Sequence, residues 1–491
     1  SDYPKLWSQY TVEVPQFYDF VILKQGFVPY VIDSSNASRA SFNIVDAGGI
    51  GAMQTFSFQA NTVQHIWAQK NIPALKDEEY VTTLDNYISK VEFQLSSIRY
   101  PERPPIPILH DWYTIANDMM KDEDFGLELT RDNNWLKDDV KAATANAKND
   151  EEKIRNIYTD VRETYNCIDD EAIWMSQPLK KTQQSKKGNV ADINILLAAM
   201  LKVAGFEVHP AILSTRDNGF PYEVYPIMNQ YNYVITEVKA ADNIYVLDAS
   251  DKDVGFNHLP LKCYNLSARV IADPPVLIEF SADSLHETKL TTAFVMNDEK
   301  GMSGSFTTQY SYFNSQDVRK AVEKYGKENY FTAIKKSIAL EAEMSNSQID
   351  SLKIPDEPVT VKYDVTFKAG EDDVIYFDPM LGNGIKDNPF KAAERYYPVE
   401  REYCTDETYL LNMEVPKGYK VDEMPKSARV NFNENEGMFE YIIAQGGGRI
   451  QLRCRVVLKK ATFAPDDYES LREFFGFIVS KQAEQIVFKK E

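Results

Sequence analysis

The side chains best suited to covalent chemistry in this sequence are four cysteines and five histidines. Only Cys263 and His258, five residues apart, suggest a nucleophilic pair. A thiolate beside an imidazole base is the arrangement used in cysteine-dependent acyl transfer. Such dyads are defined by geometry in space, and nothing in the pattern places Cys263 at the start of a helix. The sequence therefore favours a structural role for this thiol.

Metal chemistry is not indicated. The histidines are dispersed, without an H-E-x-x-H motif or a paired spacing, and no two cysteines form a C-x-x-C pair. Cys404 and Cys454 could form a disulfide across the C-terminal part of the chain, which the sequence leaves open. We expect no metal site and no cofactor.

The segment Gly188 to Asp192 stands where a buried helix is predicted to begin. The helix should run from about Asn189 to Ala204, because the residues after Asp192 are apolar over most of its surface and Gly205 is a good C-terminal cap. Asn189 and Asp192 have the types and spacing of capping residues. The unpaired N–H groups at such a helix start would also stabilise a thiolate placed there.

Three strands are predicted after this helix, over Val208–Leu213, Tyr231–Val238 and Ile244–Asp248. Helices are predicted before it, over Asp111–Met120 and after Asn149. This pattern indicates an α+β core in which a central helix packs on an antiparallel sheet.

The start of the helix and the order of the elements resemble the transglutaminase-like superfamily, whose members share a papain-like cysteine-enzyme core. In that family a Gly-x-Cys-x-Asp stretch places the nucleophile at the N-terminus of the central helix, and a histidine and an aspartate follow on the next strands. The three positions fall here on Val190, Tyr233 and Asp248. Valine has no nucleophile and tyrosine is a poor base near neutral pH. The resemblance thus implies a degenerate triad, in which no intact set of catalytic residues is left.

Both flanks extend the resemblance. Trp67–Leu75 resembles the end of an uncharacterised β domain that often precedes such cores in bacterial envelope proteins, and Tyr468–Val487 resembles the β domain that follows them. The resemblance implies a periplasmic, cell-envelope or secreted protein. The first residues show neither a basic nor an apolar signal segment, and the N-terminal domain is expected to begin partway.

Proline-rich segments divide the chain. Pro101–Pro107 holds four prolines in seven residues and should be an extended linker, and Pro274-Pro275 marks a second boundary. The C-terminal part contains a predicted helical segment near 317–342 with a weak point at Gly326. The predicted domains are an N-terminal β-rich domain (1–105), the transglutaminase-like core (106–272) and a C-terminal β-sandwich-like domain (273–491).

Four polar residues are candidates for contact with a ligand: Asn189, Asp192, Arg216 and Asn232. Asn189 and Asp192 are more simply explained as helix caps, and an arginine such as Arg216 is usually only solvated. Val190 is most simply a packing residue. Tyr233 would either fill the vacated site, with a hydrogen bond to Asp248, or contact a ligand in a remnant cleft.

Composition excludes two classes of partner. The formal charge is −20, from 54 Lys and Arg against 74 Asp and Glu. A surface this acidic repels phosphate backbones, so we expect no nucleic-acid partner. The longest apolar run, Ile195–Leu201, is far shorter than the ~18 residues of a membrane span, so we expect no such span.

Three functions stay open. The degenerate triad favours a non-catalytic binding or scaffolding module of the bacterial cell envelope. The alternative is a cysteine peptidase, or a crosslinking or amidase-type acyl transferase, that uses a displaced thiol. A second alternative is a carbohydrate- or peptide-binding protein whose β domains hold the site. A thiol near Asp248 would favour the displaced-thiol enzyme, and exposed aromatic residues in a groove on a β domain would favour the binding protein. The peptide, protein or glycan ligand is not identified.

Overall fold

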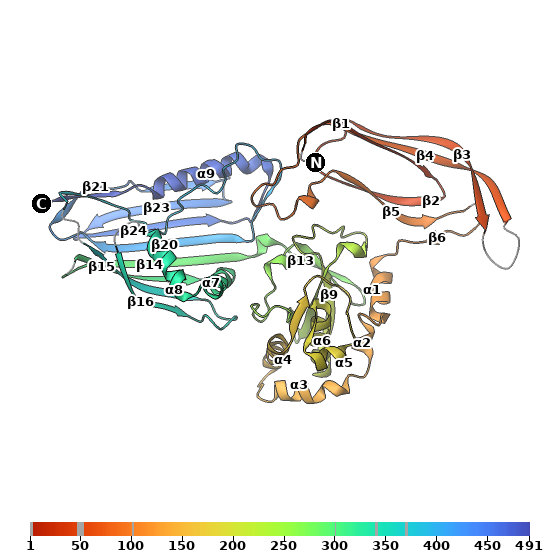
Figure 1. The fold of residues 1–491 in the computed structure, drawn as a ribbon, viewed down its shortest axis with the longest axis horizontal. Coiled ribbons are helices and arrows are strands. Elements are labelled where there is room, and N and C mark those ends of the chain that lie inside the picture. Colours follow the sequence, from red (N-terminus) through yellow and green to blue (C-terminus); the bar gives the residue numbers. More distant parts are fainter. Residues whose placement is uncertain (1–2, 47–53, 101–102, 300, 339–341, 369–371) are drawn as a thin grey trace.

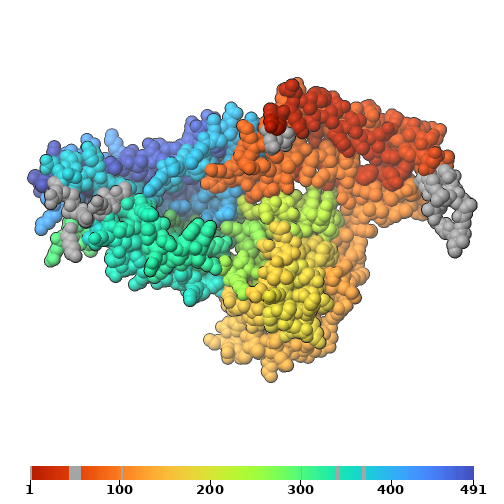
Figure 2. Space-filling model, viewed as in Figure 1, coloured from red at the N-terminus to blue at the C-terminus, as the bar shows by residue number. Residues whose placement is uncertain are grey.

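The computed structural model describes residues 3–46, 54–100, 103–299, 301–338, 342–368 and 372–491. The chain forms an N-terminal β region, a mixed core and a C-terminal β-rich region (Figure 1). This is the α+β architecture that the sequence predicts. The space-filling view shows the three regions packed against one another (Figure 2). Pro101 and Glu102 of the predicted linker lie outside the described residues.

Two three-stranded antiparallel sheets make up the N-terminal region, with the orders β1-β4-β3 and β2-β5-β6. Their strands are β1 (Lys5–Pro15), β2 (Tyr18–Gln25), β3 (Ile32–Asp46), β4 (Gln54–Ile72), β5 (Lys90–Ile98) and β6 (Ile106–Pro107). Aromatic rings pack between the sheets: the ring centroid of Trp67 is 6.2 Å from that of Tyr10 and 5.9 Å from that of Phe93. Because β6 pairs with β5, the second sheet continues to Pro107, just past the predicted boundary at 105.

The core places a central helix on a five-stranded antiparallel sheet of order β11-β10-β9-β12-β13. The helices are α1 (Trp112–Lys121), α2 (Leu127–Thr130), α3 (Lys137–Thr144), α4 (Asp150–Thr164), α5 (Leu179–Ser185) and α6 (Val190–Val203). The sheet strands are β9 (Glu207–Leu213), β10 (Tyr233–Ala240), β11 (Asn243–Leu247), β12 (Leu266–Val270) and β13 (Val276–Phe280). Two short parallel strands, β7 (Asn166–Asp169) and β8 (Lys187–Asn189), precede α6. From Val190 to Leu201 every residue of α6 is buried, as its apolar sequence predicts.

The predicted boundary at Pro274-Pro275 falls inside the core sheet. Val276–Phe280 forms β13, which pairs along its whole length with β12, so the sheet continues beyond residue 272. The two prolines lie in the turn between these strands. A proline pair ends a strand both where a turn follows within the same sheet and where a linker to another domain follows. The sequence pattern therefore does not distinguish the two cases.

An eight-stranded sheet of order β16-β17-β15-β14-β20-β24-β23-β22 forms the C-terminal region. Its strands are β14 (His286–Asp298), β15 (Gly301–Tyr310), β16 (Ala342–Asp350), β17 (Thr360–Lys368), β20 (Cys404–Glu414), β22 (Ala428–Phe432), β23 (Gly437–Gly446) and β24 (Arg449–Leu458). The buried face packs against helices and a small sheet, where the predicted sandwich would have a second large sheet. This second layer comprises α7 (Tyr312–Tyr325), α8 (Lys327–Ser337), α9 (Tyr468–Gln482), β18 (Val374–Phe377), β21 (Tyr419–Glu423) and β26 (Ile486–Lys490). A further two-stranded ladder joins β19 (Val399–Glu400) to β25 (Thr462–Phe463).

The helical segment predicted near 317–342 starts and ends earlier than expected. It is divided at Gly326, which has a φ of +84° and separates α7 from α8 as predicted. Helix α7 starts five residues early because the buried carboxylate of Glu287, on β14, accepts a hydrogen bond from the N–H of Asn314 at 2.9 Å. Ala342, the predicted helix end, is the first residue of β16.

The disulfide left open by the sequence is not formed: Cys404 and Cys454 are both free. They lie on the paired strands β20 and β24, but Cys454 stands opposite Tyr409 in the register. The two thiols are therefore offset along the strands.

Candidate functional site

The start of α6 is fixed by the two residues predicted to cap it. The Oδ1 of Asn189 accepts from the N–H of Asp192, and the Oδ2 of Asp192 accepts from the N–H of Asn189, both at 2.8 Å. This capping box satisfies two donors that the helix start leaves unpaired. Asp192 also accepts from the hydroxyl of Ser176 at 2.6 Å, and the side chain of Asn189 donates to the carbonyl of Trp174 at 2.9 Å. Both side chains are buried and engaged, and a ligand-binding role for them stays a prediction.

Gly188 lies against the same carboxylate. A Cβ at this position would stand 2.5 Å from the Cβ of Asp192 and 2.9 Å from its Oδ2, so the capping box has no room for it. We expect Gly188→Ala to destabilise the protein by about 1–3 kcal/mol through overpacking and loss of the cap. Urea unfolding measures the change. Gly476→Ala in α9 is the control, because its Cβ would meet only Asn388 at 3.6 Å. Equal stability of the Gly188 variant and the wild type would contradict this packing.

The three positions that the resemblance assigns to a triad meet at the start of α6. Val190 is its first residue, and Tyr233 is the first residue of β10; both belong to one buried cluster. The hydroxyl of Tyr233 donates to the Oδ2 of Asp248, just beyond β11, at 2.7 Å. The structure thus brings Val190, Tyr233 and Asp248 together and contains the expected tyrosine–aspartate hydrogen bond.

The carboxylate of Asp248, itself fully buried, is saturated with donors. Its Oδ1 accepts from the Nδ2 of Asn194 at 2.8 Å, the hydroxyl of Ser250 at 2.6 Å and the N–H of Ser250 at 2.9 Å. Asn194 also donates to the carbonyl of Val234 at 2.9 Å and accepts from the N–H of Ala249 at 2.8 Å. Neither Asn194 nor Ser250 was among the candidate site residues predicted from the sequence. A lone amide in an otherwise apolar buried helix was the available signal for Asn194, because such a group must find partners.

Tyr233 lies buried in this cluster as a protonated phenol. Burial and the neighbouring charge of Asp248 raise the pKa of Tyr233 well above its usual value, so its hydroxyl keeps its proton at neutral pH. The ammonium of Lys262 stands 4.6 Å from the centroid of the Tyr233 ring and forms an ion pair with Asp170. The ring is thus covered on the side that Lys262 occupies.

Two thiols border this site. Cys263 belongs to the same buried cluster as Val190 and Tyr233, and Cys167 packs against it. Burial, with a contribution from the charge of Asp248, raises the pKa of Cys263 well above its usual value and that of Cys167 to about 11. All five histidines are described, and none forms a hydrogen bond with a cysteine in the described structure. The ring of His258 stacks on Tyr312 at 3.6 Å. A thiol therefore lies near Asp248, in a state unsuited to nucleophilic attack.

Arg216 and Asn232 hold the loop that follows β9. Arg216 is half-buried rather than simply solvated, and burial lowers the pKa of its guanidinium. The guanidinium donates to three main-chain carbonyls, those of Tyr264, Glu400 and Arg401, at 3.2–3.3 Å. The side-chain amide of Asn232 accepts from the N–H of Thr215 at 2.9 Å and donates to its hydroxyl at 2.8 Å. A binding role for either residue stays a prediction.

Glu400 joins the three regions where Arg216 meets β19. Its carboxylate accepts from the N–H and the hydroxyl of Thr82 at 2.8 and 2.7 Å, and from the hydroxyl of Tyr87 at 2.6 Å. Its own N–H donates to the carbonyl of Tyr80 at 2.7 Å. A cleft of about 600 Å³ opens beside this junction, lined by residues of all three regions that include Arg216, Lys262 and Glu400. Interdomain bonds occupy several polar groups of its wall.

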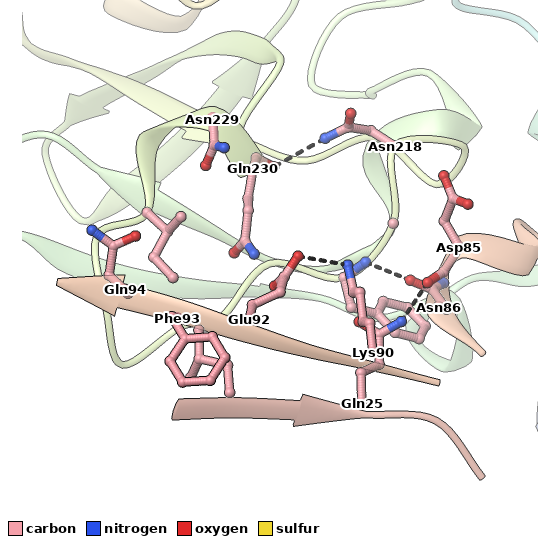
Figure 3. Close-up of a pocket in the computed structure, with 14 residues that line it drawn as sticks. Gln25, Asp85, Asn86, Lys90, Glu92, Phe93, Gln94, Asn218, Asn229 and Gln230 are labelled. Carbon is pink, nitrogen blue, oxygen red and sulfur yellow. Dashed lines mark hydrogen bonds and ion pairs between the residues drawn. The ribbon is translucent and has the colours of Figure 1, made fainter. Parts of the chain in front are cut away.

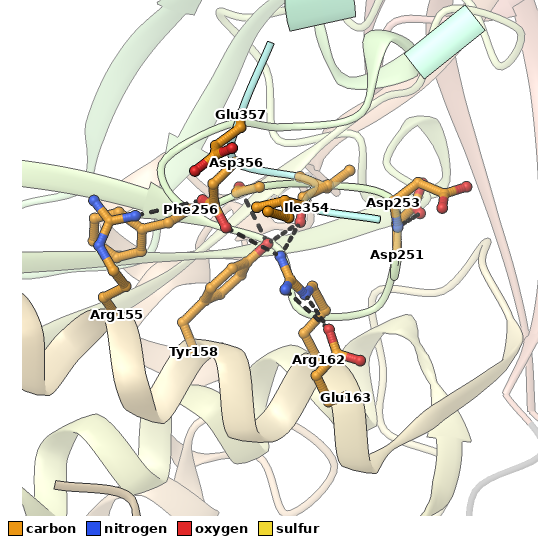
Figure 4. A network of polar contacts seen from close by, with 12 residues as sticks. Arg155, Tyr158, Arg162, Glu163, Asp251, Asp253, Phe256, Ile354, Asp356 and Glu357 are labelled. Carbon is orange, nitrogen blue, oxygen red and sulfur yellow. Dashed lines mark hydrogen bonds and ion pairs between the residues drawn. The ribbon is translucent and has the colours of Figure 1, made fainter. Parts of the chain in front are cut away.

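A second junction connects α4 of the core with the C-terminal region (Figure 4). Asp356, between β16 and β17, accepts from the N–H of Phe256 at 2.7 Å and lies 3.4 Å from Arg155 and 3.9 Å from Arg162. The hydroxyl of Tyr158 donates to the carbonyl of Val254 at 2.8 Å, beside this ion cluster. The core is thus fixed to the C-terminal region from its helical side.

Within the described residues, no helix has the length and apolar character needed to cross a membrane. The same part of the chain holds no group of three or more His, Cys, Asp or Glu side chains placed to bind a metal ion.

Comparison with known proteins gives two family matches. Residues 138–249 match the transglutaminase-like superfamily, and residues 373–488 match a domain of unknown function, DUF3858. A solved structure of a "putative protease" from Parabacteroides distasonis is similar over 100% of this chain and 73% of its own, at 12% identity and a TM-score of 0.50. A "putative cysteine protease" from Cytophaga hutchinsonii covers 50% of this chain and 76% of its own, at 12% identity and a TM-score of 0.20. No curated protein matches. At 12% identity the first likeness concerns the fold.

Proposed function

We propose that this chain, which carries a transglutaminase-like domain at residues 138–249 and a DUF3858 domain at 373–488, is a non-catalytic binding or scaffolding protein of the bacterial cell envelope. One observation carries the proposal. The three triad positions converge, yet they hold Val190, Tyr233 and Asp248, joined by packing and by a tyrosine–aspartate hydrogen bond.

The chemistry of the site supports the absence of catalysis. Acyl transfer in this fold needs a thiolate to attack and an imidazole to move the proton. Val190 supplies no nucleophile. Tyr233 is a protonated phenol whose hydroxyl donates a hydrogen bond to Asp248, so it is no base that could take up the proton of a nucleophile. The acceptor atoms of Asp248 are occupied by Tyr233, Asn194 and Ser250. The carboxylate that would orient an imidazole is instead part of the core.

A displaced-thiol enzyme is the second candidate, favoured by the presence of Cys263 and Cys167 beside Asp248. Both thiols have raised pKa values, and neither has an imidazole partner among the described contacts. The thiol that is poised for attack in cysteine enzymes has a lowered pKa, so the observed environment favours the non-catalytic reading.

Thiol labelling tests the proposal. Because the raised pKa of about 11 keeps Cys167 protonated, only ~0.1% of it is thiolate at pH 8, on the order of a hundredfold less than for a free cysteine. We expect slow iodoacetamide labelling of all four cysteines, with the rate at Cys167 increasing as pH rises toward 11. Mass spectrometry from pH 7 to 10 measures this, and urea-unfolded protein is the control. One cysteine that reacts faster when folded, together with hydrolysis of a peptide substrate, would overturn the proposal.

Scaffolding is supported by the contacts between regions. Glu400 joins the N-terminal region to the C-terminal region, and Asp356 joins the core to the C-terminal region. The transglutaminase-like core would then hold the two β regions in a fixed relation. The envelope location rests on the family resemblance of the flanking domains, and cell fractionation tests it: recovery of the native protein in the cytosol alone would contradict it.

A further inference from the structure

A cleft of about 480 Å³ separates the N-terminal region from the core (Figure 3). One wall is a face of the sheet formed by β2 and β5, together with η1 (Leu84–Asn86). The other is the loop after β9 with η3 (Met228–Gln230). The volume lies within the range of about 300–1,000 Å³ that is typical of small-molecule sites. None of the degenerate triad residues lines this cleft.

The sheet wall follows from strand register. Gln25 pairs with Lys90 and Leu23 with Glu92, and Gln94 lies two residues further along β5, so all five side chains are on one face. The ring of Phe93, between them in sequence, packs against Trp67 inside the N-terminal region. The strand face that lines the cleft is therefore mostly polar, and Phe93 also belongs to the lining.

Neutral amides dominate the lining. Six side chains of this type contribute: Gln25, Asn86, Gln94, Asn218, Asn229 and Gln230. Several are held in place by the chain: Asn86 accepts from the N–H of Phe220 at 2.8 Å, and Asn218 donates to the carbonyl of Gln230 at 3.0 Å. Three charged residues also line the cleft. Lys90 and Glu92 form an ion pair at 3.1 Å on the sheet wall, and Asp85 of η1 is exposed.

Two amides face each other across the cleft without a partner in the described structure. Gln94 comes from β5 and Asn229 from η3, on opposite walls, and Figure 3 shows both at the same end of the cavity. Each offers two N–H donors and one carbonyl acceptor. A ligand between them would need donors and acceptors at close spacing and no net charge.

We propose that this cleft binds a neutral oligosaccharide. Each sugar hydroxyl both donates and accepts, which matches an amide. The apolar faces of sugar rings match Phe220, which is 37% exposed, and the partly exposed Ile227. Extended peptides are bound most readily at a strand edge through main-chain bonds. This cleft presents the side chains of a sheet face, which favours the sugar. The inference rests on the proposed function of a binding protein and names its ligand class.

The test is titration calorimetry on the whole chain with neutral di- to hexasaccharides built from glucose or N-acetylglucosamine. Gln94→Ala and Asn229→Ala are the variants, and Gln445→Ala, which removes an exposed amide of the C-terminal hairpin, is the control. We expect at least one sugar to bind, and each cleft variant to weaken it tenfold or more while the control binds as the wild type does. Because neither side chain has a hydrogen-bond partner among the described residues, the melting temperatures should be unchanged.

Each other outcome overturns the inference: no sugar of the panel binds, the cleft variants bind as the wild type does, or an uncharged pentapeptide binds with the same dependence while the sugars do not. The proposed function fails separately. Cleavage of a bound sugar or of a peptide substrate would contradict its non-catalytic character without removing the binding result.

Discussion

Asp248→Ala is expected to destabilise the protein by about 3–5 kcal/mol, because removing one side chain leaves a set of buried donors unsatisfied. The donors are the hydroxyl of Tyr233, the amide of Asn194, and the hydroxyl and N–H of Ser250. Asp248 and the three residues that carry these donors are buried, so water cannot replace the lost acceptor without opening the core.

Urea unfolding of the variant measures this loss. Asp242→Ala, in the exposed turn between β10 and β11, is the control and should change stability by less than about 0.5 kcal/mol. Tyr233→Phe removes only one donor and should cost about 1–2 kcal/mol. A double-mutant cycle between positions 233 and 248 then gives their coupling. Wild-type stability of Asp248→Ala would contradict the closed network described here.

Glu400→Ala is expected to release the N-terminal region from the rest of the molecule. The variant loses the acceptor for Thr82 and Tyr87, whose donors are then left within an interdomain contact. We expect a loss of about 2–4 kcal/mol and faster cleavage of the segment between β4 and β5 in limited proteolysis, since this segment carries Tyr80, Thr82 and Tyr87.

Glu402→Ala is the matched control, because Glu402 lines the same cleft but is exposed and forms no hydrogen bond in the described structure. Proteolysis with mass mapping of the cut sites measures the release. Identical digestion of the Glu400 and Glu402 variants would show that Glu400 does not hold the regions together.

Local chemistry could be predicted from the sequence and non-local chemistry could not. Asn189 and Asp192 predict the helix start because a capping box involves residues only three positions apart. The start of α7 depends on a hydrogen bond from Asn314 to Glu287, which lies on β14, 27 residues earlier in the chain. The sequence pattern therefore predicts a start for this helix that is too late. The polar network at Asp248 shows the same limit, since Asn194 lies 54 residues away from its partner.

The cleft between the regions had no signal in the sequence. Its walls come from β2, η1, β5 and a loop some 130 residues further on, and amides such as Gln94 and Asn229 are ordinary surface residues when considered singly. In contrast, the sequence signal at Pro274-Pro275 was misleading. The two prolines suggested a domain boundary, whereas β13 after them continues the core sheet. Prolines show where a strand ends, but they do not show whether the strands on either side pair with each other.

Under the proposed function, the tyrosine at the position that the resemblance assigns to histidine would also make the loss of chemistry hard to reverse in evolution. Val190→Cys alone would give a buried thiol without a base, and Tyr233→His alone would replace the phenol beside Asp248 by an imidazole without a nucleophile. Neither single step would offer an activity that selection could retain. A lineage with these replacements would therefore diversify through its binding surfaces rather than through renewed catalysis.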